Sequence, residues 1–180
     1  MERFLAAASQ HRRADSYTCW GAGVSVPAIN AAPILNRSFT ITAAIETPAE
    51  AAGVVLALGS KFGGWSFFVK DGVPVALMAA SQLAGDQSRV AATAKLPAGS
   101  SVLSYQFVSD GGVNAGGEIR IGVNGREVAR GRIARTISKL PEMTDTLDIG
   151  FDADTPVCTE YRDEGRFNGV LSRVDISIDR

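Results

Sequence analysis

The chain has few of the residues that catalysis usually requires. Its 180 residues include one histidine, His11, and two cysteines, Cys19 and Cys158. Nucleophilic triads place a histidine near a serine or cysteine, and zinc sites place histidines and cysteines at close spacing. His11 lies in a polar N-terminal segment and the cysteines stand far apart, so neither kind of site is predicted. Two free thiols are favoured over a disulfide, because a core of this size does not need one.

The sequence also lacks an excess of charge and long apolar runs. Its 18 basic and 19 acidic residues are well mixed and give a net charge of -1, which argues against a nucleic-acid-binding face. No apolar run approaches the ~20 residues that span a bilayer, so no membrane segment is predicted. Hydrophobic residues make up 46% of the chain, which is typical of a globular protein.

The stretch around Trp65 has the pattern of a strand that is buried on both faces. Trp65 and Phe67 alternate with Ser66 and Phe68, so each face of the strand carries an aromatic ring. The Lys-Asp-Gly that follows has the backbone freedom of a tight hairpin turn, and residues 73–78 return as the partner strand. A strand covered on both sides implies a second layer of sheet packed on the first.

Similar short alternating segments recur along most of the chain, with Asn124-Gly125 as a clear hairpin turn. Further strands are predicted at residues 39–46, 54–58, 89–94, 101–108, 118–123, 127–133, 147–151 and 170–178. This spacing predicts an all-β, jelly-roll sandwich of two antiparallel sheets over residues 16–180. Residues 2–10 are predicted to form a short helix within an N-terminal segment, 1–15, and residues 14–35 to be irregular.

The loop after the strand at 147–151 is rich in carboxylates. Asp152, Asp154 and Glu160 have the oxygen ligands that Ca²⁺ prefers. Arg162 and Arg166 lie in or just after the same loop, and arginine forms bidentate pairs with carboxylates without any metal. We predict that arginine–carboxylate pairs hold this loop, with a Ca²⁺ site as the alternative and no other cofactor.

A series of short motifs, in this order and spacing, carries a family resemblance between Ser16 and Ile178. The motifs lie at residues 36–43, 62–67, 69–72, 96–99, 110–112, 123–126, 148–150, 154–157 with Tyr161, and 166–169. Together they resemble the C-terminal domain of bacterial arylsulfatases, a sandwich of the concanavalin A-like lectin/glucanase type. In one departure from the family, residues 76–80 are Ala-Leu-Met-Ala-Ala where the family often carries tyrosines.

The resemblance implies an accessory, non-catalytic role beside a sulfatase catalytic domain, which is the implied partner. Residues 1–15 would then be the remnant of that preceding domain. Sulfatases make a formylglycine from the first residue of Cys/Ser-x-Pro/Ala-x-Arg. Cys158 and Arg162 have this spacing, but Glu160 stands where proline or alanine belongs. The chain alone is therefore not expected to be an enzyme.

Two other functions stay open at this point. A free-standing carbohydrate-binding module would use aromatic rings to contact sugars, and Trp65 and Tyr105 are the candidates. For Trp65, packing in the core is the favoured alternative, because its strand is covered on both sides. A jelly-roll assembly protein is the third possibility, and it leaves a homo-oligomer open.

Overall fold

A computed structural model describes residues 14–142 and 144–179 and folds them into two antiparallel sheets of six strands each. The first sheet has the order β1 (Ser16–Trp20), β12 (Val170–Ile178), β3 (Phe39–Thr47), β8 (Gly99–Ser109), β9 (Ala115–Val123) and β10 (Arg126–Arg135). The second has the order β2 (Val24–Pro27), β11 (Thr146–Ile149), β4 (Gly53–Ser60), β5 (Gly63–Lys70), β6 (Val73–Ala79) and β7 (Gln87–Ala91).

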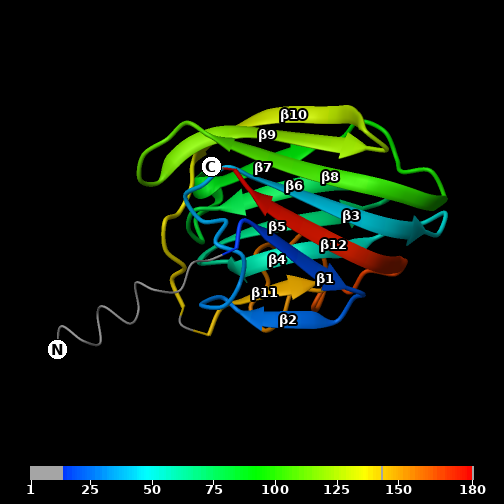
Figure 1. Ribbon diagram of the computed structural model, residues 1–180, viewed down its shortest axis with the longest axis horizontal. Coiled ribbons are helices and arrows are strands. Elements are labelled where there is room, and N and C mark those ends of the chain that lie inside the picture. Colours follow the sequence, from blue (N-terminus) through cyan, green and yellow to red (C-terminus); the bar gives the residue numbers. More distant parts are fainter. Residues whose placement is uncertain (1–13, 143, 180) are drawn as a thin grey trace.

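The two sheets pack face to face, and Figure 1 shows the first sheet crossing in front of the second. The predicted all-β jelly-roll sandwich is thereby confirmed. Among the described residues, helical structure is confined to the short 3-10 turn η1 (Ala84–Asp86), and no helix is long and apolar enough to cross a membrane. The helix predicted at residues 2–10 lies outside the described residues.

An aromatic cluster fills the space between the sheets. Trp65 and Phe67 project from β5 and meet Phe39 of β3 and Tyr105 and Phe107 of β8. Ring centroids lie 5.0 Å apart for Trp65 and Phe107 and 5.4 Å apart for Phe67 and Tyr105. All five rings are buried. Since aromatic pairs at these spacings add to the stability gained by burial, this cluster is the centre of the fold.

The opposite face of β5 is also buried, as the alternation predicted. Phe68 packs there in a second, smaller apolar cluster with Val54, Val157 and Cys158. This side is covered by residues 150–169, named here the covering loop, which connects β11 to β12. The second sheet therefore has the first sheet on one face and this loop on the other.

The expected irregular region at residues 14–35 contains two strands, β1 and β2, and that prediction was wrong. β1 pairs with β12, and β2 pairs with β11. Gly21 and Gly23, both with positive φ, separate the two strands. These glycines lie in the connection between the sheets. In the sequence they indicate irregular structure, and the strands on either side are only five and four residues long, too short for a clear alternating pattern. Cys19 lies on β1, and both cysteines are free thiols.

The covering loop comes into backbone contact with β4 at Gly53. A Cβ built on Gly53 would lie 2.5 Å from the carbonyl oxygen of Arg166 and 2.5 Å from the Cα of Phe167. The φ of Gly53 is 115°, a backbone angle that residues with a side chain rarely adopt. Only glycine therefore lets the loop approach the sheet this closely.

We expect Gly53→Ala to lower the free energy of unfolding by more than backbone strain alone explains. Gly99→Ala is the matched control, because Gly99 has a φ of 93° and open space around its Cβ. Left-handed strain costs about 1–2 kcal/mol at either site, and overpacking adds about 1–3 kcal/mol at Gly53. Urea denaturation measures both variants. Equal losses would contradict a tight contact between loop and strand.

Candidate functional site

The covering loop is held on the second sheet by a buried carboxylate, Asp152. Its Oδ2 accepts hydrogen bonds from the Tyr161 hydroxyl and from the backbone N–H of Val157, the latter at 2.8 Å. The Tyr161 hydroxyl also lies 3.0 Å from Oγ of Ser66 on β5. The other Asp152 oxygen, Oδ1, has no hydrogen-bond partner among the described residues. This chain of hydrogen bonds connects the loop to the middle of the sheet.

Burial sets the protonation of this group. It raises the pKa of Asp152 to about 7, although the hydrogen bonds from Tyr161 and Val157 act in the opposite direction. The nearby carboxylates Asp148 and Asp145 raise this pKa further. Burial, followed by the charge of Asp152, also raises the pKa of Tyr161. The loop anchor is therefore a carboxyl group that is neutral in acid and ionises only as the pH rises through about 7.

A second anchor is the ion pair of Glu160 with two strands. Arg89 of β7 contacts Glu160 with Nε at 2.7 Å and Nη2 at 3.2 Å, and Lys70 of β5 places Nζ 3.1 Å from Oε2. Partial burial opposes the charge of Glu160, but these bonds and charges outweigh it and lower its pKa. Glu160 is therefore ionised at neutral pH and holds the loop to the end of β5.

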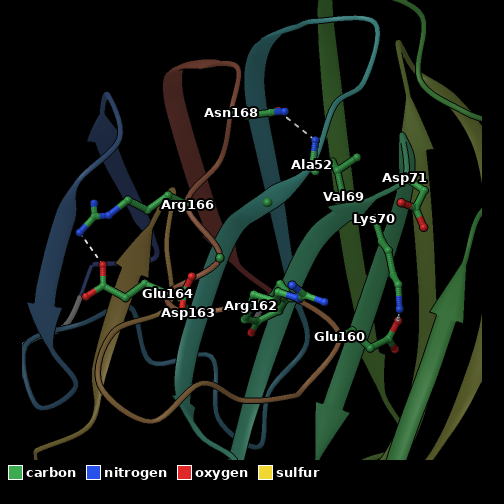
Figure 2. A pocket seen from close by; sticks show the side chains of 13 residues that line it. Ala52, Val69, Lys70, Asp71, Glu160, Arg162, Asp163, Glu164, Arg166 and Asn168 are labelled. Carbon is green, nitrogen blue, oxygen red and sulfur yellow. Dashed lines mark hydrogen bonds and ion pairs between the residues drawn. The ribbon is translucent and has the colours of Figure 1, made fainter.

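Between the covering loop and the sheet lies a pocket of about 850 Å³ (Figure 2). One wall is formed by the start of β4 and the residue before it. A second consists of the end of β5 and its turn, and the third is the loop itself. Its lining residues are Ala52, Gly53, Val69, Lys70, Asp71, residues 160–166 and Asn168. This volume lies within the usual range for small-molecule sites, about 300–1,000 Å³.

Three charged side chains of the pocket stay unpaired. Arg162, Asp71 and Asp163 line it and form no ion pair with another described residue. In Figure 2, Arg162 belongs to the covering loop and Asp71 to the β5–β6 turn, on different walls. Unpaired donors and acceptors on different walls are free to bind a polar ligand. The sequence did not single out any of these three residues for binding, because Asp71 looks like an ordinary turn residue there and Arg162 a loop-stabilising one.

The carbohydrate-contact residues predicted from the sequence lie inside the sandwich. Trp65 is 0% exposed and Tyr105 1% exposed, and their rings pack against Phe39 and each other. Both side chains face the other sheet, so neither offers a ring face to a sugar in this structure. Core packing, the favoured alternative for Trp65, is the role that the structure shows.

The candidate Ca²⁺ ligands each have a different environment. Asp152 is buried beside Tyr161, Glu160 is paired with Lys70 and Arg89, and Asp154 is exposed. In the described parts of the chain, no three His, Cys, Asp or Glu residues gather as a metal centre would require.

Arginine–carboxylate pairs do form in the covering loop, but not between the residues that the sequence predicted. Arg166 does form an ion pair, but with Glu164, and its guanidinium also lies 5.0 Å from the centre of the Phe151 ring. Arg162 pairs with none of the predicted carboxylates. The expected partners were wrong because Glu160 pairs instead with Lys70 and Arg89, which are 90 and 71 residues away from it in the sequence.

The outer face of the first sheet is a second, shallower candidate surface. Trp20 is 69% exposed at the end of β1 and lies opposite Arg173, whose guanidinium is 5.2 Å from its ring. Across the sheet the next outward positions on this row are Ala44 and the exposed Val102, and Thr42 lies on the neighbouring row. Two hollows of about 330 and 260 Å³ lie on this face. Since the hollows on this face are smaller, the pocket beneath the covering loop is the stronger candidate.

Comparison with solved structures supports the fold. The CBM40 domain of the Ruminococcus gnavus IT-sialidase is similar with a TM-score of 0.62 and 13% identity, over 89% of this chain and 91% of that one. Domain 4 of AbnA, a GH43 extracellular arabinanase from Geobacillus stearothermophilus, in complex with arabinotriose, has a TM-score of 0.54 and 11% identity, over 81% and 62%. The laminin alpha1 domains LG4-5 from mouse have a TM-score of 0.53 and 11% identity, over 93% and 42%.

These neighbours are concanavalin A-like jelly-roll sandwich domains, and at such identities the likeness establishes the fold alone. No protein-family model matches the chain, and neither does any curated protein. The neighbours give no link to a sulfatase, so that part of the resemblance stays a prediction from the sequence.

Proposed function

We propose that this chain is a non-catalytic carbohydrate-binding domain that holds a sugar in the pocket beneath the covering loop. The pocket carries the proposal, because it combines a volume of about 850 Å³ with unpaired Arg162, Asp71 and Asp163. Sugars present many hydroxyl groups, each of which donates and accepts hydrogen bonds. Charged partners make the strongest such bonds, and both signs are available on the pocket walls.

The fold supports the same proposal from a second direction. One structural neighbour is a carbohydrate-binding module by name, and another is a domain seen with arabinotriose. Because one fold supports many functions, this likeness adds to the argument from the pocket and does not replace it. The sulfatase catalytic domain as a partner rests on the sequence resemblance alone.

We expect the protein to bind at least one glycan on an array, and Arg162→Ala to weaken that binding about tenfold or more. Isothermal titration with the best array glycan measures the loss. Arg126→Ala is the matched control, because Arg126 is also an exposed arginine without an ion pair but lines a hollow on the first sheet.

The binding of the two variants decides where the site lies. Loss of binding in Arg162→Ala but not in Arg126→Ala supports the pocket. The reverse pattern would move the site to the outer face of the first sheet. An array on which no glycan binds would contradict the proposed function itself. Equal melting temperatures of the variants and the unmodified protein would exclude unfolding as the cause.

A further inference from the structure

Most charges around the pocket are already neutralised by protein partners. Lys70 and Arg89 share Glu160, and Arg166 pairs with Glu164. Arg162, Asp71 and Asp163 are unpaired among the described residues. Together with Arg89, which pairs with Glu160 but does not itself line the pocket, these groups make four positive and four negative side chains, a net charge of zero. A pocket with this balance has no overall attraction for an anion or a cation.

Two of the unpaired groups, Asp71 and Arg162, lie on different walls and stand on backbone that is held in place without a ligand. Asp71 occupies the β5–β6 turn with a φ of 52°, and the next residue, Gly72, is bound on both sides. Its N–H donates to Ala51 O and its carbonyl accepts from Leu96 N–H, each at 2.8 Å. Arg162 lies in a turn closed by the Gly165 N–H, which donates to the Arg162 carbonyl at 2.8 Å. Little backbone ordering is left for binding.

The chemistry of these two groups selects for hydroxyl groups. A carboxylate is an acceptor only, and a guanidinium is a donor only. A ligand with several neutral hydroxyls can supply both a donor for Asp71 and an acceptor for Arg162. A carboxylated or sulfated sugar can pair with Arg162, but it brings its negative charge into a pocket with unpaired Asp71 and Asp163. Such an unfavourable pairing is how sites reject the wrong ligand.

We propose that Asp71 and Arg162 together make this pocket selective for neutral, hydroxyl-rich sugars over acidic ones. The inference rests on the proposed function and adds the class of ligand. Asp71 is the residue that excludes acidic sugars, and Arg162 is the donor that a neutral sugar needs. Lys70 lines the site, but it does not bind an anion because its ammonium group is paired with Glu160.

The test compares matched sugars by isothermal titration. The neutral probes are arabinotriose, xylotriose, cellotriose and lactose, and the acidic ones are trigalacturonic acid and 3′-sialyllactose. We expect at least one neutral probe to bind about tenfold or more tightly than either acidic probe. Its Kd is expected to change less than about twofold between about 20 and about 500 mM NaCl, because no net charge is neutralised.

Asp71→Asn removes the charge at a position where asparagine also adopts positive φ. We expect it to weaken the neutral probe about tenfold and to reduce the discrimination against the acidic probes. Asp154→Asn is the control, since Asp154 is an exposed acid of the covering loop that also has a positive φ but does not line the pocket. This control is expected to change neither the affinity for the neutral probe nor the discrimination against the acidic probes.

Tighter binding of an acidic probe, or equal discrimination by Asp71→Asn and the unmodified protein, overturns the selectivity while leaving the proposed function in place. Failure of every probe and of the glycan array overturns both. A loss of binding in Asp154→Asn equal to that in Asp71→Asn would show a general effect of loop charge, and that result also overturns the role of Asp71.

Discussion

Replacing Trp65 with alanine is expected to destabilise the fold by about 3–5 kcal/mol, as for other large aromatic side chains in a packed core. Trp65 is 0% exposed and contacts rings of β3 and β8 from the other sheet. Removing the indole leaves a cavity between the sheets that the surrounding strands cannot fill. For a domain of this size, the melting temperature should fall by about 10 °C or more.

Trp20→Ala is the matched control, because the same substitution there removes a side chain that is 69% exposed. We expect its melting temperature to stay within a few degrees, as surface substitutions usually change stability by about 0.5 kcal/mol or less. Thermal unfolding followed by circular dichroism compares the two variants. An unchanged melting temperature for Trp65→Ala would show that the aromatic cluster does not stabilise the sandwich.

The second large effect is a loss of stability as the pH rises through neutrality. The pKa of Asp152 in the folded protein is about 7, above the ~3.9 of an unfolded chain. The folded state therefore retains a proton that the unfolded state has lost. The stability from this group is complete below about pH 4 and is lost as the pH rises through about 7. The full change is about 4 kcal/mol, and about 3 kcal/mol of it falls between pH 5 and pH 8.

Asp152→Asn isolates this contribution, because an asparagine amide resembles the protonated acid in shape and still accepts from Tyr161 and Val157. Between about pH 5 and about pH 8, we expect the free energy of unfolding of the variant to rise by about 3 kcal/mol relative to that of the unmodified protein. Urea denaturation at several pH values measures the difference. If the free energies of unfolding of the two proteins change in parallel with pH, Asp152 is already ionised at pH 5 in the folded protein.

The paired carboxylates Asp110 and Glu127 have the opposite effect on stability. Their pKa values are lowered in the folded protein, so the stability that they contribute is lost as the pH falls in the acid range.

The elements predicted correctly are those whose signals are local. The alternation of β3 and β12 and the turns after Lys70 and Val123 depend on residues within a few positions of each other. A strand's period places its side chains on two faces wherever the strand lies, so the two-sided burial of β5 was also predictable. Hence the sequence alone determined the all-β class, the sandwich architecture and most of the strands.

Only the tertiary structure decided what lies against those faces. It showed that Trp65 and Tyr105 face the other sheet, that Glu160 pairs with Lys70 and Arg89, and that Asp152 is buried. It also left Arg162, Asp71 and Asp163 as the unpaired charged groups of a pocket built from three separate segments. Such contacts join residues far apart in the chain, and oppositely charged side chains are frequent enough that many pairings are equally compatible with the sequence. Which pair forms depends on the register of the strands and the path of the covering loop, and both are set by packing across the whole domain.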